Sequence, residues 1–295
     1  FEKATYEYLI YLDAHPKQFQ MISDRIMAFP NESSINEKIK SILIKSDVIN
    51  AQFILADIQF KLKEFDNAYK TLIKSNCTSS MLFDFGKDLY TVGEYIRAEN
   101  VFNEVMGSTN NEKLLTDTIF EIAKIFESKL TVSKKALNIS GFYANNSFFT
   151  SPFLSIKKQS GSTLKNTMKI YDSLRVSKKN AQAAFRLAEV QYRILGDLDR
   201  ALYLYQEASK YGNTLDLRID SAIGILDVYM SKGDLTTAKN KCDNLITKYP
   251  TELIFQIKYA QILFYDGNYS DTETALKSLI KEIPSDNKSF NDIMD

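Results

Sequence analysis

The chain has few of the residues that build reactive or metal-binding sites. Its 295 residues include no Trp, one His and two Cys. His15 has no second imidazole to join it in a metal site, and two distant cysteines do not form a tetrahedral zinc site. The phosphate-loop, dinucleotide-binding, nucleophile-elbow and zinc-protease motifs are also missing from the sequence. We therefore expect no enzymatic activity, no bound metal and no cofactor.

Helix-breaking residues and long apolar runs are scarce as well. The chain has 10 Gly and 5 Pro, with 44% hydrophobic and 25% charged residues, a composition that favours a helical protein. It has no run of about 18 apolar residues, so the sequence predicts no transmembrane helix. The first residue is Phe1 rather than Met, and we expect the chain to be a piece of a longer or processed protein.

A regular period is visible near the C-terminal end of the chain. Gly267 follows Gly233 at the same spacing at which Pro284 follows Pro250. A fixed period of this length is typical of stacked helix pairs, because the apolar face of each pair is covered only by its neighbours. The sequence therefore predicts an all-α repeat array.

Upstream stretches repeat a related pattern, with a small residue in a first helix, a tight turn and an alanine early in a second helix. The copies are Ala56, Lys63 and Ala68; Gly86, Gly93 and Ala98; and Ala188, Gly196 and Ala201. At these positions, over about 49–108 and 181–284, the chain resembles the tetratricopeptide repeat (TPR) family. Lys63 replaces the family's turn glycine and Thr272 replaces its alanine. One copy carries an extra residue before Gly196, which we expect to lengthen its first helix.

The resemblance implies a TPR-like α-solenoid of stacked antiparallel helix pairs without catalytic function. The family's members are generally scaffolds for protein–protein interaction, which implies a subunit or adaptor of a larger assembly. Its protein partner would be held as an extended segment in a groove lined by first helices. The run from Ala184 to Tyr205 is also similar to repeats of bacterial cell-envelope proteins, including lipoproteins of outer-membrane assembly and secretion. This second resemblance favours the periplasm or cell envelope over the cytoplasm.

We expect four segments along the chain. They are 1–48, a degenerate helical repeat region; 49–138, TPR-like repeats; 139–163, an irregular aromatic and basic insertion; and 164–295, C-terminal TPR-like repeats. Gly141, Pro152 and Gly161 oppose a long helix in the insertion. The helical array is therefore expected to be interrupted once.

Charge is distributed unevenly around this insertion. The whole chain has 37 basic and 37 acidic side chains, but 129–180 contains ten Lys or Arg against Asp172 alone, a net charge of +9. The candidate aromatic and basic surface comprises Phe142, Tyr143, Phe148, Phe149, Phe153, Lys157 and Lys158. Three interpretations stay open. The aromatic side chains fold back onto neighbouring repeats, or the insertion is a protein-binding element, or the zone is a regulatory or targeting module that binds nucleic acid or anionic lipid.

The groove of such an array is lined by first-helix residues that do not face the second helix of their pair. Here these positions are polar with scattered aromatics, which suits an extended segment held by many modest contacts. The candidate groove residues are Gln52, Gln59, Asp84, Asp88, Gln182, Arg186, Glu189, Arg193, Lys258, Gln261 and Tyr265.

The two cysteines are expected to stay unpaired. Cys77 and Cys242 lie several repeats apart in the sequence, and each repeat of a stacked array touches only its neighbours, so their sulfurs should be far apart. Cys242 takes the second-helix position that Phe102 and Leu72 hold in other copies. This predicts a small, buried hydrophobic side chain.

Overall fold

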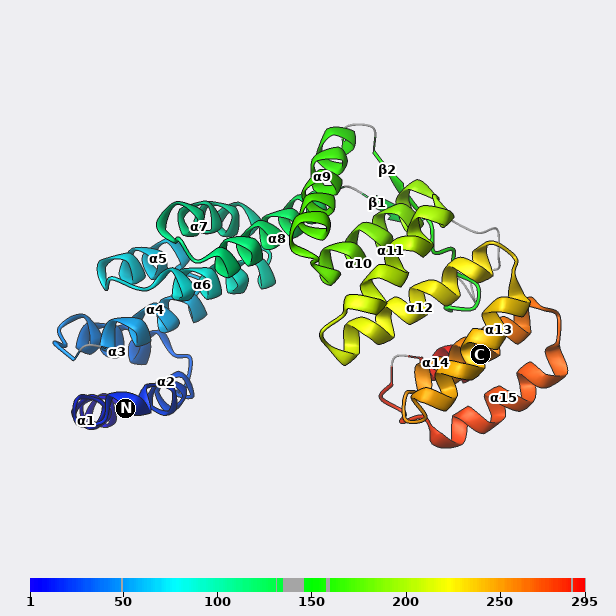
Figure 1. Cartoon of the computed structure of the whole chain (residues 1–295). Helices are drawn as coiled ribbons and strands as arrows, with labels where there is room; N and C mark the ends of the chain where they lie inside the picture. The colour runs from blue at the N-terminus through cyan, green and yellow to red at the C-terminus, as the bar shows by residue number, and fades with distance from the viewer. Residues whose placement is uncertain (49, 131, 135–145, 158–159, 288, 295) are drawn as a thin grey trace. The chain divides into compact units, whose positions relative to one another are not determined.

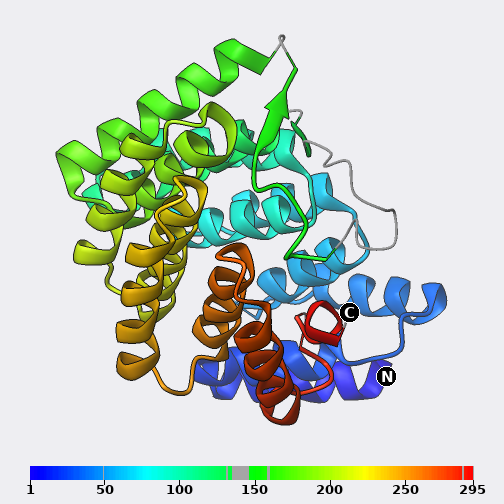
Figure 2. The ribbon, with the colours of Figure 1, turned by 90° about the vertical axis from the view of Figure 1, so that its right-hand side faces the viewer.

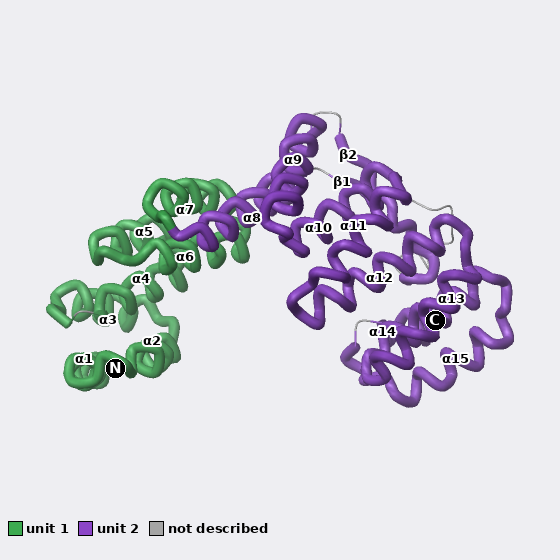
Figure 3. Tube along the Cα trace, in the orientation of Figure 1, with its two compact units in different colours: residues 1–110 green, residues 111–295 purple. Residues whose placement is uncertain are grey.

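The computed structural model describes residues 1–48, 50–130, 132–134, 146–157, 160–287 and 289–294. The chain divides into two compact units, 1–110 and 111–295 (Figure 3). Within each unit, helices pack against their neighbours in the sequence (Figure 1). The predicted all-α solenoid of stacked helix pairs is confirmed, with one small two-stranded sheet in addition. The four segments predicted from the sequence were defined by repeat type, whereas these two units are defined by compactness. The four segments therefore stay predictions.

Unit 1 consists of helices joined by short connections. They are α1 (Glu2–Ala14), a 3₁₀ turn (Pro16–Gln18), α2 (Phe19–Met27), α3 (Ser33–Ile44), α4 (Ala51–Lys61), α5 (Phe65–Lys74), α6 (Ser79–Thr91) and α7 (Tyr95–Ser108). The pairs α4–α5 and α6–α7 are the clear repeats of the sequence. Pro16 begins the 3₁₀ turn that leads into α2, where its missing N–H costs nothing.

Unit 2 contains the remaining helices and the sheet. Its helices are α8 (Glu112–Ser128), α9 (Gly161–Lys178), α10 (Ala181–Glu189), α11 (Leu198–Tyr211), α12 (Leu215–Ser231), α13 (Leu235–Lys248), α14 (Leu253–Tyr265), α15 (Tyr269–Glu282) and α16 (Phe290–Met294). Strands β1 (Val132–Lys134) and β2 (Leu154–Ile156) pair antiparallel, with Val132 opposite Ile156. Both strands lie between α8 and α9, the two helices of one repeat.

Close helix crossings explain why glycine stands at two positions within helices. A Cβ atom added at Gly86 would lie 2.6 Å from the ring of Phe102, and one at Gly224 would lie 2.5 Å from the ring of Tyr205. Both rings are completely buried. A larger residue at either glycine would therefore force the aromatic ring or the backbone to move.

The thiols follow the prediction. Cys77 and Cys242 are both free, and Cys242 is completely buried in unit 2. The Cys242 thiol donates a hydrogen bond to the Phe255 carbonyl over 3.1 Å, and burial raises its pKa to about 12. An apolar, protonated thiol of this kind serves packing rather than reactivity.

We expected the extra residue before Gly196 to lengthen its α-helix. Instead, it widens the helix. Val190–Leu195 forms a π-helical turn after α10, in which the N–H of Gly196 donates to the carbonyl of Gln191. A π turn absorbs one additional residue without moving the helix end. It keeps Tyr192 in the core of unit 2 while Gly196 still makes the turn into α11.

Candidate functional site

The described end of the insertion lies along consecutive first helices of unit 2. We call residues 146–156 the insertion segment. From β2 it runs toward the C-terminal helices (Figure 2), and it contacts the π turn, α14 and α16 through hydrogen bonds. The helices that it contacts, together with α12, form the surface that we call the groove.

One end of the insertion segment is fixed by three polar contacts. The Asn146 amide donates to the backbone carbonyl of Asp292 over 3.0 Å. The Tyr265 hydroxyl donates to the Phe148 carbonyl over 2.6 Å, and the Gln261 amide approaches the Ser147 hydroxyl at 3.4 Å. Tyr265 and Gln261 both come from α14, so a single helix holds two successive residues of the segment.

The other end is fixed at the π turn. The Arg193 guanidinium donates through Nε to the Pro152 carbonyl over 3.3 Å and also pairs with Glu189 at 3.4 Å. The next residues of the segment enter β2, where Ile156 packs against the buried Leu130 and Val190. The π turn therefore aims Arg193 at the segment.

Aromatic contacts cover both ends of the insertion segment. The rings of Phe148 and Phe149 meet the ring of Phe264 edge-on, with centroids 5.9 and 5.5 Å apart. Phe153 meets the ring of Tyr192 at 5.6 Å. Phe148 is only 5% exposed. These three side chains fold back onto neighbouring repeats, as one of the open interpretations held.

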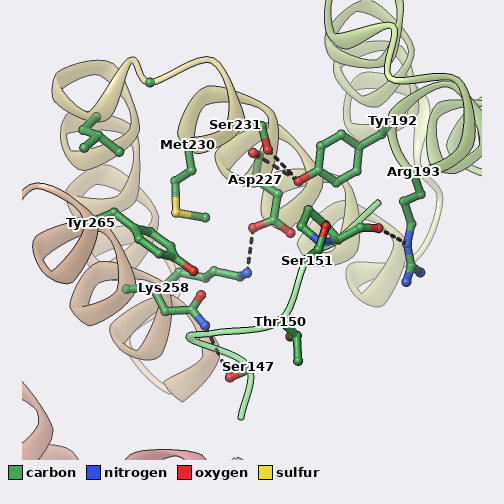
Figure 4. Close-up of a pocket in the computed structure, with 14 residues that line it drawn as sticks. Ser147, Thr150, Ser151, Tyr192, Arg193, Asp227, Met230, Ser231, Lys258 and Tyr265 are labelled. Carbon is green, nitrogen blue, oxygen red and sulfur yellow. Dashed lines mark hydrogen bonds and ion pairs between the residues drawn. The ribbon is translucent and has the colours of Figure 1, made fainter. Parts of the chain in front are cut away.

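A cavity of about 580 Å³ lies between the middle of the segment and the groove (Figure 4). The Lys258 ammonium pairs with the Asp227 carboxylate at 2.6 Å on its wall. The Tyr192 hydroxyl is 2.9 Å from the Ser231 hydroxyl, and burial followed by the charge of Asp227 raises the pKa of Tyr192. Among the described residues, no group of three or more His, Cys, Asp or Glu side chains could hold a metal ion. The cavity offers paired charges and hydroxyls for polar recognition.

Only some of the candidate groove residues of unit 2 lie at this site. Arg193, Gln261 and Tyr265 contact the insertion segment, and Lys258 lines the cavity beside it. Arg186 instead pairs with Glu127 of α8 at 2.7 Å.

Two residues of the predicted set turn toward the second helix of their own pair. Glu189 accepts a hydrogen bond from the hydroxyl of Tyr205 in α11. In unit 1, Gln59 accepts one from Thr71 of α5 over 2.8 Å. The expectation that these two side chains do not face the second helix is therefore wrong, because each accepts a hydrogen bond from a hydroxyl of that helix.

Gln52 and Asp84, two further candidates of unit 1, have local partners. The Gln52 amide donates to the Leu43 carbonyl over 3.0 Å, and Asp84 pairs with Lys87 at 2.8 Å. Burial, followed by the negative charge of Asp84, raises the pKa of Asp88. In unit 2, Gln182 is the second residue of α10 and is exposed. No contact of these residues identifies a ligand, so their role in partner binding stays a prediction.

The basic zone is interrupted by acidic side chains from other elements. Arg175 pairs with Glu207 at 2.8 Å and with Asp172 at 2.7 Å, and Lys178 pairs with Glu112. Lys157 is exposed. Phe142, Tyr143 and Lys158 lie outside the described residues. None of the described helices is long and apolar enough to cross a membrane.

Several residues of the site were missed at the sequence level. The main ones are Asn146, Ser147, Tyr192, Asp227, Ser231 and Phe264. Two of them follow from the period, because Asp227 and Ser231 stand one full period before Gln261 and Tyr265. The contacts of Asn146 and Phe264 are long-range and have no such signal.

Comparison with known proteins gives a consistent result for the fold. A family model described as a tetratricopeptide repeat matches residues 182–214. The chain is similar to the structure of a tetratricopeptide repeat protein from Parabacteroides merdae, with 13% identity and a TM-score of 0.52 over 99% of this chain and 100% of that one. It is also similar to the apo form of the quorum sensor NprR from B. thuringiensis, with 14% identity and a TM-score of 0.54 over 95% of this chain and 76% of that one. No curated protein sequence matches it.

Proposed function

We propose that this chain, a tetratricopeptide repeat protein, is a scaffold whose groove in unit 2 binds an extended polypeptide segment of a protein partner. Its fold suggests a protein-interaction scaffold. The observation that carries the finer proposal is the insertion segment, a stretch of polypeptide that begins with a turn, ends in β2 and is held by side chains from α14 and the π turn. A surface that holds one such segment has the chemistry to hold another.

The mode of contact supports this proposal. The hydroxyl of Tyr265 and the guanidinium of Arg193 donate to backbone carbonyls, which every polypeptide has. The ring of Phe264 contacts aromatic side chains, which only some polypeptides have at the right spacing. Backbone contacts of this kind give affinity and side-chain pockets give specificity. We extend the proposal to a role as a subunit or adaptor of a larger assembly.

The test requires access to the groove, so it starts from the double variant Phe148→Ser, Phe149→Ser. These substitutions remove two aromatic contacts from the insertion segment and change no residue of the helices. Random peptides displayed on phage are selected against this variant, and the enriched peptides are measured by fluorescence anisotropy. We expect the enriched peptides to be rich in aromatic residues and to contact Gln261 and Tyr265, the hydrogen-bond donors of α14.

Two further double variants locate the binding site. Gln261→Ala with Tyr265→Phe removes both donors of α14, and the expected loss of affinity is about tenfold or more, because each hydrogen bond contributes roughly 1 kcal/mol. Tyr203→Phe with Gln206→Ala is the matched control, since both residues are exposed on α11. Peptides that bind all these proteins equally, or the absence of any enriched peptide, would refute the proposed function.

A further inference from the structure

The insertion segment has a turn that presents two neighbouring aromatic side chains together. The Asn146 side-chain oxygen accepts the N–H of Phe148 over 2.9 Å, and the Asn146 carbonyl accepts the N–H of Phe149 over 3.0 Å. In an extended strand, successive side chains point to opposite faces. The turn instead brings Phe148 and Phe149 onto the same ring, that of Phe264. The recognised feature is therefore an Asn-turn followed by two aromatic residues.

The far end of the segment adds a second feature. Pro152 uses its carbonyl as acceptor for Arg193, and it has no N–H that would need a partner. Phe153 follows directly and contacts Tyr192. None of the residues 146–156 is charged. The whole pattern is an uncharged stretch with paired aromatics, two small residues, and then proline with a third aromatic.

The middle of the segment leaves room beside the groove. Thr150 and Ser151 border the cavity of about 580 Å³, opposite Asp227 and Lys258 (Figure 4). Their short side chains leave room at this point for a longer one. Another polypeptide with a longer polar side chain at this point would make more contacts with the groove.

We infer that the insertion segment is an internal competitor for the groove, and that the partner is a polypeptide segment with the same Asn-turn and aromatic pattern and a longer polar residue at the position of Ser151. This inference rests on the proposed function and adds the partner's chemistry and its regulation. The amide of a glutamine fits the cavity wall, because its oxygen accepts from Lys258 while its NH₂ donates to Asp227.

Covalent continuity makes the insertion segment an effective competitor. A segment tethered in the same chain is present at an effective concentration of the order of millimolar, far above that of a free partner. The apparent affinity for a partner is then the intrinsic affinity multiplied by the fraction of molecules in which the groove is vacant. The partner binds only when the insertion segment leaves.

The probe is a fluorescein-labelled peptide with the sequence of residues 146–156, added to the complete chain. We expect the wild-type protein to bind it at least about tenfold more weakly than the Phe148→Ser, Phe149→Ser variant does. Asn146→Ala is a second opened variant, which removes the bond to Asp292 at the end of the segment. The control peptide has Ser in place of all three Phe residues and should not bind. Far-UV circular dichroism and the urea midpoint verify that each variant is folded.

The outcomes separate this inference from the proposed function. Equal affinity of the wild type and both opened variants overturns internal competition and leaves the proposed function standing. If Gln261→Ala with Tyr265→Phe does not weaken binding of the peptide to an opened variant, both the inference and the proposed function are overturned. A second peptide, with Gln at the position of Ser151, should bind the opened variant several-fold more tightly than the first peptide. Equal affinity of the two peptides overturns the assigned polar residue.

Discussion

One helix pair of unit 2 differs from the clear repeats of unit 1 in the connection between its helices. In unit 1, three residues join α4 to α5 and α6 to α7, whereas in unit 2 residues 129–160 separate α8 from α9. Nevertheless α8 and α9 pack against each other as the short-linked pairs do. The cost of closing a loop grows only slowly with its length, while the packing of two apolar faces does not depend on it. The repeat is therefore defined by its helix faces rather than by its turn.

The largest effect is expected when a glycine at a close helix crossing is replaced in each unit, because this change disturbs the packing of the helix faces. Gly86→Ala in unit 1 and Gly224→Ala in unit 2 should each lower the free energy of unfolding by about 2–3 kcal/mol, because the new Cβ meets a buried ring at 2.6 and 2.5 Å. Urea denaturation followed by circular dichroism measures the loss.

Gly107→Ala is the control for both glycines. Gly107 lies near the end of α7, and a Cβ there meets no atom within 4 Å. This change should leave stability unchanged or raise it by up to about 1 kcal/mol, as alanine favours a helix over glycine. A similar effect at all three positions would show that close crossings do not organise the units.

The second test concerns the contact between first helices on either side of the insertion. Glu127 of α8 pairs with Arg186 of α10 at 2.7 Å and accepts a bond of 2.8 Å from Tyr171. Arg186→Met should cost about 1–2 kcal/mol, less than for a fully buried pair because Arg186 is one-third exposed. The exposed pair Lys178–Glu112 is the comparison, and Lys178→Met should cost about 0–1 kcal/mol. Equal losses would mean that the inner pair adds nothing to the docking of α10 on α8.

The turns provide a third, smaller comparison. Lys63 takes the backbone conformation of Gly93 at the equivalent turn, with φ of 61° against 85°. A residue with a Cβ costs about 1–2 kcal/mol in the left-handed conformation. Replacing it by glycine removes this cost, but glycine also gives the unfolded chain greater freedom, which offsets part of the gain. Lys63→Gly should therefore stabilise the protein by up to about 1 kcal/mol, and Gly93→Lys should destabilise it by a similar amount. Thermal unfolding of both variants checks the two signs.

The smallest effect is expected from a buried carboxyl of unit 1. Burial, followed by the charges of Asp88 and Asp24, raises the pKa of Asp57, although Ser23 donates a hydrogen bond to it. A raised pKa in the folded state favours the protonated native protein, so this stabilisation is complete below about pH 4 and is lost as the pH rises. Asp57→Asn should match the wild type at acid pH and exceed it by up to about 1 kcal/mol at pH 7.

Asp66→Asn serves as a control of opposite sign. Arg97 donates to the Asp66 carboxylate and thereby lowers its pKa. The wild type should therefore be the more stable protein at pH 7, with the difference vanishing at acid pH. Melting temperatures measured across the pH range test both predictions. If the melting temperature of Asp57→Asn changed with pH in parallel with that of the wild type, the buried charge of Asp57 would be excluded as the cause of the stability difference.

The sequence predicts the repeated helix pairs because their turns and crossings need particular residues. Gly233 and Gly267 supply the left-handed turns, and Gly86 supplies space for Phe102. The π turn was not predictable in this way. An additional residue before Gly196 can extend a helix or widen it, and both leave the glycine at the turn. Only the packing of Tyr192 in the core distinguishes the two.

The candidate site was predictable in part. Gln261, Tyr265 and Arg193 were identified because they occupy the outer side of first helices, and Phe148 because aromatic residues cluster in the insertion. That these two groups meet was not predictable, since Phe148 and Tyr265 are separated by 117 positions along the chain. Local patterns assign side chains to faces and say nothing of which distant segment covers a face.

The bond from Asn146 to the carbonyl of Asp292 has a consequence for how unit 2 folds. Pairs in a simple helical array interact only with adjacent pairs, so folding can spread along the array and ends can fray separately. A link between positions 146 residues apart ties the last helix to the repeat of α8 and α9. Long-range contacts raise contact order, which slows folding and lets distant elements unfold together. We therefore expect unit 2 to unfold more cooperatively than a row of independent hairpins would.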